Sequence, residues 1–328
     1  SLLPEPATAA AATDLPNAPA VAPTTAPATL YVPYAAQPAP DQDLPSAQHS
    51  AEPSQPAMAT PPEAPAAAAA AAEHPAEPGN LWDRIRAGFA MADYDHWLIA
   101  RHSSQFASNS AYVERIVQRS RRYLFHIVEE VEARGMPAEI ALLPIVESAF
   151  NPTAYSRARA SGIWQFIPAT GKHYGLSQNW WYDGRRDIMA ATSAALDYLQ
   201  VLYNMFGDWQ LALAAYNCGE GCISRAIARN RNAGLPTDFM SLTLPRETRN
   251  YVPKLLGIRE IVRTPERFGL TLAPIPNERY FAAVSTTRHI DVQRAAQFAE
   301  ISEQEFLDLN PGYNGPVITA HTEQIILV

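Results

Sequence analysis

The chain has 328 residues and a formal net charge of −8, and this negative charge resides in its first 80 residues. Residues 1–80 contain eight acidic residues and no lysine or arginine, whereas the remainder has 25 acidic and 25 basic residues. No basic segment interleaved with aromatic residues indicates nucleic-acid binding, and no apolar run approaches the roughly 20 residues of a membrane span.

Residues 1–80 differ in composition from the rest. They hold 17 of the 29 prolines and the alanine run Ala66–Ala72, with few large apolar side chains. Burial of so few apolar side chains cannot offset the conformational entropy that the chain would lose on folding. We therefore expect a disordered, acidic Ala/Pro-rich tether. A short helix over Ala64–Glu73 is the alternative, although isolated helices of that length are marginal in water. Because the sequence starts at Ser1, an export signal or a lipid-carrying cysteine could precede it and provide N-terminal membrane anchoring.

From Leu81 onward, apolar residues recur at helical spacing. The clearest case is 110–134, where one apolar stripe predicts a single helix. A glycine and a proline separate it from a second predicted helix, Ala138–Phe150, which contains Pro144. Further helices are predicted at 187–206, 209–216, 221–231 and 246–263. Since strand signals are scarce before residue 278, residues 81–273 predict a compact, mainly α domain.

After Pro276 the pattern changes to short elements. The predicted elements are a strand at 280–285, helices at 291–300 and 302–309, and a strand at 324–328. Ser302, with Glu305 three residues later, forms the capping box that opens the second of these helices. We therefore expect a small β-α-α-β unit over residues 278–328.

Glu147 is the residue with the clearest chemical signal. It lies among Ile145, Val146 and Phe150, and a carboxyl group held among apolar side chains is hard to ionise. Its pKa should therefore rise, which allows it to donate a proton near neutral pH, as cleavage of a glycosidic bond requires.

No second carboxylate occupies an obvious partnering position. Asp183, Asp187 and Glu220 are conceivable, but the segment Asp-Gly-Arg-Arg-Asp is explained more simply by surface ion pairs, which contribute little. Glu247 is explained by a favourable interaction with the N-terminal dipole of its helix.

Two other groups of residues leave alternatives open. Cys218 and Cys222 either form a short-loop disulfide, if the chain is exported, or are two packed thiols, and we favour the thiols. No Cys/His cluster completes a metal site around them, and no nucleotide-binding loop is present, so we expect no metal and no cofactor. The cluster Trp180–Tyr182 could stack on sugar rings or form an edge of the core.

Four segments, in this order and spacing, resemble the lytic transglycosylases of peptidoglycan. They read EIALLPIVESAFNP, SGIWQFIPATGKHYGL, ALAAYNCGEG and LPRETRNYVPK. The resemblance extends from Leu81 to the C-terminus. It implies a goose-type lysozyme-like (SLT) catalytic domain that cleaves the β-1,4 bond between N-acetylmuramic acid and N-acetylglucosamine in peptidoglycan glycan strands.

The resemblance also implies roles for individual residues. Glu147 corresponds to the catalytic acid/base of the family. The positions that correspond to substrate-binding residues are Ser148, Gln165, Tyr216, Asn217 and Tyr251. Trp164 stands where the family more generally has methionine, and the pair Cys218 and Cys222 is not part of the family pattern.

One acid/base suffices for the reaction that the resemblance implies. The N-acetyl group of the sugar assists, and its C6 hydroxyl then attacks C1 to give a 1,6-anhydro end without using water. Two alternatives remain: a muramidase on the same fold that adds water instead, and a catalytically silent scaffold that binds the cell wall.

The resemblance further implies a place for the protein and a role for its C-terminal unit. Residues 278–328 resemble a degenerate LysM glycan-binding module. We expect a periplasmic location, with anchoring to the outer membrane through the N-terminus as an option.

Overall fold

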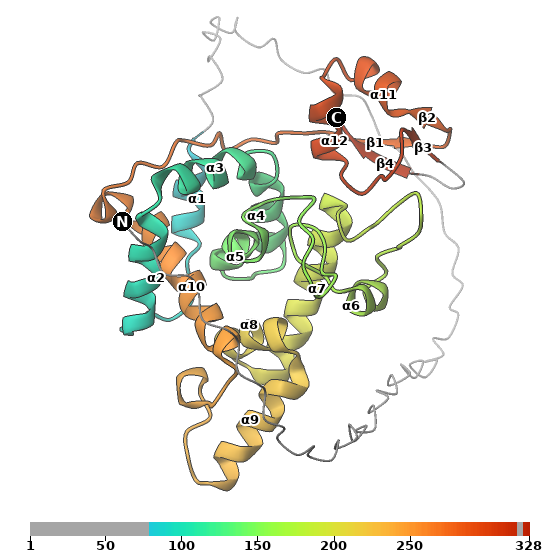
Figure 1. Cartoon of the computed structure of the whole chain (residues 1–328). Helices are drawn as coiled ribbons and strands as arrows, with labels where there is room; N and C mark the ends of the chain where they lie inside the picture. Colours follow the sequence, from blue (N-terminus) through green and yellow to red (C-terminus); the bar gives the residue numbers. More distant parts are fainter. Residues whose placement is uncertain (1–78, 320–323) are drawn as a thin grey trace, which may run out of the picture. The chain divides into compact units, whose positions relative to one another are not determined.

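The computed structural model describes residues 79–319 and 324–328 (Figure 1). The predicted tether and its alternative helix Ala64–Glu73 fall outside these residues, except for positions 79 and 80. None of the helices in the described part of the chain is both long enough and apolar enough to span a membrane.

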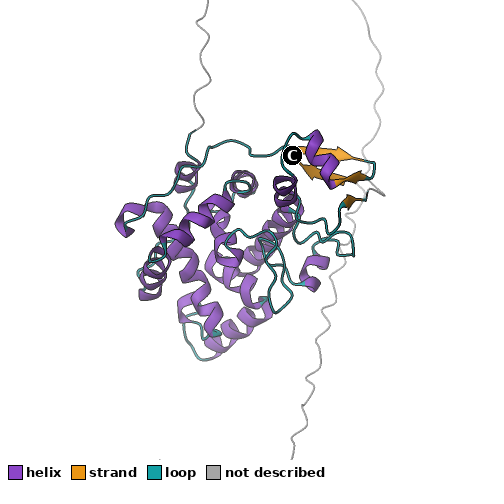
Figure 2. Cartoon of the chain, turned by 45° about the horizontal axis from the view of Figure 1, so that its top comes forward, coloured by secondary structure: helices purple, strands orange, loops and turns teal. Residues whose placement is uncertain are grey.

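The described part of the chain is mainly helical, as predicted, with strands only in its C-terminal unit (Figure 2). The α-helices before residue 270 are α1 (Leu81–Ala87), α2 (Trp97–Ala107), α3 (Ser110–Ser120), α4 (Leu124–Ala133), α5 (Leu143–Ser148), α6 (Pro168–His173), α7 (Ile188–Phe206), α8 (Trp209–Cys218), α9 (Glu220–Asn232) and α10 (Arg246–Arg263). Short 3₁₀ helices are formed by Ala138–Leu142, Phe239–Ser241 and Pro265–Phe268.

Two predicted helices are interrupted. The single helix expected over 110–134 is two helices, α3 and α4, and at the break the buried Ser120 hydroxyl donates to the carbonyl of Val117 (2.8 Å). Such local side-chain bonds compete with the helix. The helix expected over 138–150 is a 3₁₀ turn followed by the six-residue α5, because Pro144 in the first turn of α5 cannot donate a backbone hydrogen bond.

Helix α8 lies at the centre of the helical core. Its residues Ala212–Ala215 have no exposed surface, and it contacts α7, α9 and α10. Small side chains allow neighbouring helices to approach it closely.

Helices α2 and α10 also approach closely, at Gly257. The Ser103 hydroxyl of α2 donates to the carbonyl of Gly257 (3.1 Å), and a Cβ atom at this glycine would lie only 3.0 Å from the Ser103 nitrogen.

A buried ion pair connects α10 to the segment before α5. Glu139 has no exposed surface and accepts hydrogen bonds from the backbone of Ala90 and Met91, each at 3.1 Å. Arg259 of α10, which is 1% exposed, lies 3.4 Å from the same carboxylate and 2.8 Å from Asp93. These bonds fix the position from which α5 begins.

The C-terminal unit contains two small antiparallel pairs of strands. Its elements are β1 (Ala283–Thr286), β2 (Ile290–Asp291), α11 (Val292–Phe298), α12 (Glu303–Leu309), β3 (Val317–Ile318) and β4 (Gln324–Leu327). Strand β1 pairs with β4, with Ala283 opposite Leu327, and β2 pairs with β3. The outer strands and both helices correspond to the predicted β-α-α-β pattern, whereas the two-residue strands β2 and β3 are too short to give a sequence signal. The division at residues 273–278 stays a prediction.

Contacts between the C-terminal unit and the helical part occur at the break between α3 and α4. Arg122 forms a bond of 2.6 Å with Glu305 and one of 3.2 Å with Asp308. The hydroxyl of Tyr123, a residue that is 1% exposed, donates to the carbonyl of Asp308 (2.7 Å).

Substitution of Glu139 tests the buried pair. Glu139→Ala leaves the Arg259 guanidinium and two backbone amides without this partner, so we expect the free energy of unfolding to fall by about 3–5 kcal/mol. Urea denaturation followed by circular dichroism measures this change. The control is Glu114→Ala, an exposed residue of α3, which should change the free energy by less than about 0.5 kcal/mol. If Glu139→Ala lowers the free energy of unfolding no more than the control does, the buried pair does not stabilise the fold.

Candidate active site

Helix α5 places Glu147 one residue before its end. The next two residues, Ala149 (φ 53°) and Phe150 (φ 54°), have left-handed backbone conformations that are uncommon outside glycine. The amide of Phe150 donates to the carbonyl of Pro144 (3.2 Å), and its ring has no exposed surface. Burial of this ring supports the strained turn, which stops the helix directly after the carboxylate.

Glu147 faces a cavity of about 550 Å³. Four of the five other predicted site residues line the same cavity: Gln165, Tyr216, Asn217 and Tyr251. They come from the loop after α5, from α8 and from α10, so the fold brings together residues that are up to 104 positions apart in the chain.

The pKa of Glu147 is raised to about 7. Burial is the main cause, since it disfavours the charged form, and the charge of Glu247 acts in the same direction. A hydrogen bond from the Tyr251 hydroxyl to Oε1 and the charge of Lys254 partly oppose this rise. Burial also raises the pKa of Tyr251 well above its usual value, so Tyr251 keeps the proton that it donates to the carboxylate.

The loop 162–166 is held against the core on one side of the cavity. Gly162 (φ 83°) begins it, and a Cβ atom there would lie 2.0 Å from the carbonyl oxygen of Arg185, so only glycine fits. Trp164 has no exposed surface, and its indole N–H donates to the Thr192 hydroxyl of α7 (3.0 Å). The tryptophan that departs from the family's methionine therefore anchors the loop in the core.

Gln165 presents one polar atom to the cavity. Its Nε2 donates to the carbonyls of Gly162 (2.8 Å) and Ala154 (3.3 Å). These two carbonyls require donors, which determines the orientation of the amide and leaves its Oε1 as the atom available to a ligand.

Tyr216 and Asn217 are oriented by hydrogen bonds at the end of α8. The Tyr216 hydroxyl donates to the carbonyl of Trp164 (2.8 Å), so its ring rather than its proton is offered to the cavity. Asn217 accepts a bond from the Thr248 hydroxyl through Oδ1 (2.8 Å), which leaves its Nδ2 donors available. Gln165 and Asn217 thus provide an acceptor and a donor in one cavity.

Ser148 does not line the cavity. Its hydroxyl donates to the carbonyls of Ile163 (3.0 Å) and Pro144 (3.3 Å), which connects α5 to the loop 162–166. This geometry makes Ser148 a positioning residue for Glu147, and its predicted contact with substrate stays a prediction.

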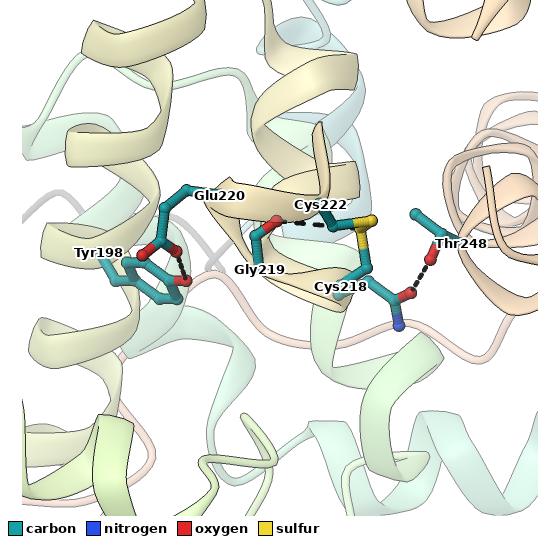
Figure 3. Close-up of a disulfide and its surroundings, with 7 residues drawn as sticks. Tyr198, Cys218, Gly219, Glu220, Cys222 and Thr248 are labelled. Carbon is teal, nitrogen blue, oxygen red and sulfur yellow. Dashed lines mark hydrogen bonds between the residues drawn. A yellow bond between two sulfur atoms is a disulfide. The ribbon is translucent and has the colours of Figure 1, made fainter. Parts of the chain in front are cut away.

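Cys218 and Cys222 form a disulfide, with their Cα atoms 5.9 Å apart (Figure 3). The preference for two packed thiols is therefore wrong. The reason is Gly219 (φ 87°), whose backbone conformation ends α8 and begins α9. The turn at this residue brings the two cysteine side chains toward each other. Cys218 also lines the cavity, so the disulfide supports its wall next to Asn217.

The candidate second carboxylates have structural partners. Asp183 pairs with Arg185 at 2.7 Å, and because both side chains are largely buried, the predicted surface ion pair is an interior one. Asp187 caps α7 through the amide of Ala190 (2.7 Å) and accepts a bond from Tyr182, while Glu220 accepts a bond from Tyr198 (3.2 Å; Figure 3).

Glu247 and Lys254 also line the cavity, on the same helix as Tyr251. We did not predict either as a site residue. A signal was available, because Glu247, Tyr251 and Lys254 are separated by four and three positions, which places them on one face of α10.

The aromatic cluster predicted at 180–182 divides into two parts. Trp180 is 84% exposed and Trp181 is 49% exposed, so they do not form an edge of the core. Tyr182 packs against Tyr313 of the C-terminal unit, with 5.2 Å between the ring centroids.

Comparison with known proteins agrees with the resemblance found in the sequence. Residues 126–237 match the family model described as the transglycosylase SLT domain. The membrane-bound lytic murein transglycosylase D of Escherichia coli (strain K12) is 41% identical over 251 residues, which cover 76% of this chain and 56% of that protein.

Two further relatives match shorter parts. A protein of Alteromonas sp. (strain M-1) named for tributyltin chloride resistance is 46% identical over 126 residues, or 38% of this chain and 61% of that protein. The membrane-bound lytic murein transglycosylase C of Haemophilus influenzae (strain PittGG) is 28% identical over 152 residues, or 41% of this chain and 42% of that protein. The chain thus spans little more than half the length of the first of these relatives.

The raised pKa of Glu147 predicts a pH-dependent effect on stability. Between pH 4.5 and about 7 the folded state binds more protons at this site than the unfolded state, so stability falls as pH rises through this window. Glu147→Gln removes the ionisable group, so the melting temperature of the variant relative to the native protein should be higher at pH 8 than at pH 4.5.

Differential scanning calorimetry at the two pH values measures this difference. Glu114→Gln, on the exposed face of α3, serves as the control. Its melting temperature relative to the native protein should be the same at both pH values. An equal offset for Glu147→Gln at pH 4.5 and pH 8 would show that the carboxylate is solvated in the native protein.

Proposed function

Because this chain belongs to the lytic transglycosylases with an SLT domain, we propose that it cleaves peptidoglycan between N-acetylmuramic acid and N-acetylglucosamine without using water. The observation that carries the proposal is the buried carboxyl group of Glu147, whose pKa is raised to about 7 and which lines a cavity with polar groups suited to sugars. A carboxyl with that pKa can donate a proton and later accept one near neutral pH.

In the first step, protonated Glu147 donates to the glycosidic oxygen as the bond from C1 to this oxygen breaks. Tyr251 donates to Oε1, so the transferred proton is carried by Oε2. The carbonyl oxygen of the sugar's acetamido group assists at C1, which replaces the second carboxylate that most glycosidases use.

In the second step, the carboxylate of Glu147 accepts the proton of the C6 hydroxyl as the C6 oxygen forms a bond to C1. The bond between C1 and the acetamido oxygen breaks at the same time, which restores the acetamido group. The product is a 1,6-anhydro end, and Glu147 is again protonated. Between the two steps Glu147 is a charged carboxylate, and the hydrogen bond from Tyr251 is strongest to this form. Tyr251 therefore stabilises the charged form of Glu147.

The polar groups of the cavity support binding of amide-bearing sugars. The Oε1 of Gln165 can accept from an acetamido N–H, and the Nδ2 of Asn217 can donate to an acetamido or hydroxyl oxygen. The ring of Tyr216 offers an apolar face to a sugar ring.

A hydrolytic muramidase is the second candidate, and one observation favours it. Glu247 is an exposed carboxylate that lines the cavity of Glu147, where it could orient a water molecule. The first candidate is favoured by the family, since the E. coli relative is named a lytic murein transglycosylase.

The disulfide supports a location outside the cytoplasm. Disulfides persist in oxidising compartments such as the bacterial periplasm, and the E. coli relative is named membrane-bound. We therefore place the protein in the periplasm, held near the outer membrane by its N-terminal region, and we assign residues 278–328 as a LysM-like unit that assists glycan binding.

The products of cleavage test the reaction. We expect digested cell-wall sacculi to give muropeptides lighter by one water molecule than hydrolysed ones, as detected by mass spectrometry. Glu147→Gln should lower turnover by at least about 100-fold, since it removes the proton donor. Glu247→Gln should still yield anhydro ends, whereas hydrolysed ends from the native protein would favour the muramidase. Unchanged function of Glu147→Gln in cells would favour a non-catalytic scaffold.

Tyr251→Phe tests the hydrogen bond to Glu147. Loss of this donor removes an interaction that lowers the pKa of Glu147, so the fall in kcat on the alkaline side should move to higher pH. We expect kcat to drop by about 10- to 100-fold as the charged form loses its donor. The control is Tyr203→Phe, at a tyrosine that stacks on Trp209. A pH profile of Tyr251→Phe with unchanged shape would assign Tyr251 to packing alone.

A further inference from the structure

A second cavity, of about 730 Å³, adjoins the candidate active site. It is formed by one face of α2 and the first half of α10, the two helices that approach closely at Gly257. Glu247 and Lys254 line both cavities, so the two spaces share a wall. A ligand beside Lys254 in the first cavity therefore lies next to the second cavity.

The second cavity is cationic. Four basic side chains line it, Arg101 from α2 and Arg246, Arg249 and Lys254 from α10, against one acidic side chain, Glu247. None of the four forms an ion pair with an acid in the part of the chain that the structure describes. In contrast, Arg259 and Arg263 of the same helix pair with Asp93 and Glu260. The concentration of unpaired positive charge is thus specific to this stretch of α10.

The rim of this cavity carries an exposed aromatic ring. Trp97 is 64% exposed, and the guanidinium of Arg101 lies over it, 6.0 Å from the ring centroid. This contact holds an otherwise free arginine at the mouth of the cavity. A preorganised guanidinium loses less entropy when it binds an anion.

We propose that this cationic cavity binds the carboxylates of the peptide stems that peptidoglycan strands carry. The inference rests on the proposed function and identifies which form of the strand the protein prefers. The hydroxyl and acetamido groups of the sugars are neutral, whereas peptide stems bear free carboxylates. Arginine and lysine bind carboxylates through charge-assisted hydrogen bonds. In this arrangement the peptide of a muramyl unit beside Glu147 runs past Lys254 to the basic side chains of the second cavity.

The test compares three glycan substrates with the full-length protein. The first carries its native peptides. The second has been stripped of peptides by an amidase, which leaves only the lactyl carboxylate on each muramic acid. The third keeps peptides whose carboxylates have been converted to amides. We expect native strands to be cleaved with a kcat/KM about 5- to 10-fold above that of the other two, as two to four exposed charge pairs would give. Added salt should reduce this preference.

The double variant Arg101→Gln/Arg249→Gln removes charge from the second cavity at residues that do not line the first. Because Arg246 and Lys254 remain, it should lower the ratio of kcat/KM between native and peptide-free strands to about 2- to 3-fold. The matched control, Arg229→Gln/Arg231→Gln, removes two charges from the exposed end of α9 and should keep the native ratio.

Each outcome has a defined meaning. A native protein that cleaves all three substrates equally overturns the inference while leaving the proposed function intact, since anhydro products still form. A double variant that keeps the native preference overturns it as well. Absence of anhydro products from every substrate would instead refute the proposed function. The comparison of native with amidated strands requires no variant, so it decides the question even if the double variant fails to fold.

Discussion

Three consecutive backbone carbonyls hold the candidate site together. Those of Gly162, Ile163 and Trp164 accept hydrogen bonds from Gln165, Ser148 and Tyr216, respectively. The three side chains come from the loop itself, from α5 and from α8. The loop can serve as this common acceptor because Gly162 packs directly against the carbonyl of Arg185 and Trp164 is buried against α7. The position of Glu147 relative to Gln165 and Tyr216 in the cavity therefore follows from one tightly packed loop.

The same arrangement explains how one carboxylate can serve as acid and base. Apolar surroundings raise the pKa of Glu147, while Tyr251 and Lys254 limit the rise. The pKa therefore lies near neutral pH, so the carboxyl group can both lose and regain its proton. Holding an acid in this balance costs stability at high pH, and the strained turn at Ala149 and Phe150 adds a further local cost. The densely packed core of α7, α8 and α10 offsets both costs.

The sequence predicted the long helices and the location of the acid well, since both depend on local patterns of apolar residues. Glu147, Gln165, Tyr216, Asn217 and Tyr251 do line one cavity. Features that depend on contacts distant in sequence were predicted less well. At the break between α3 and α4, Arg122 and Tyr123 contact Glu305 and Asp308. The pair of Asp183 and Arg185 is local in sequence, but its burial depends on distant partners of Arg185, the carbonyls of Arg159 and Phe166. The disulfide depended on the backbone conformation of Gly219. Glu247 and Lys254 were missed for a different reason, since their spacing from Tyr251 already places them on one face of α10.

The break between α3 and α4 has a consequence for cooperativity. Arg122 and Tyr123, which follow α3, form their polar contacts with Glu305 and Asp308 of the C-terminal unit. Because the buried hydroxyl of Tyr123 has its acceptor there, removal of residues 274–328 would leave that group without its partner and uncover the ring beside it. The helical part and the C-terminal unit therefore share part of their folding free energy. A fragment cut at the predicted boundary would therefore be less stable than the intact chain.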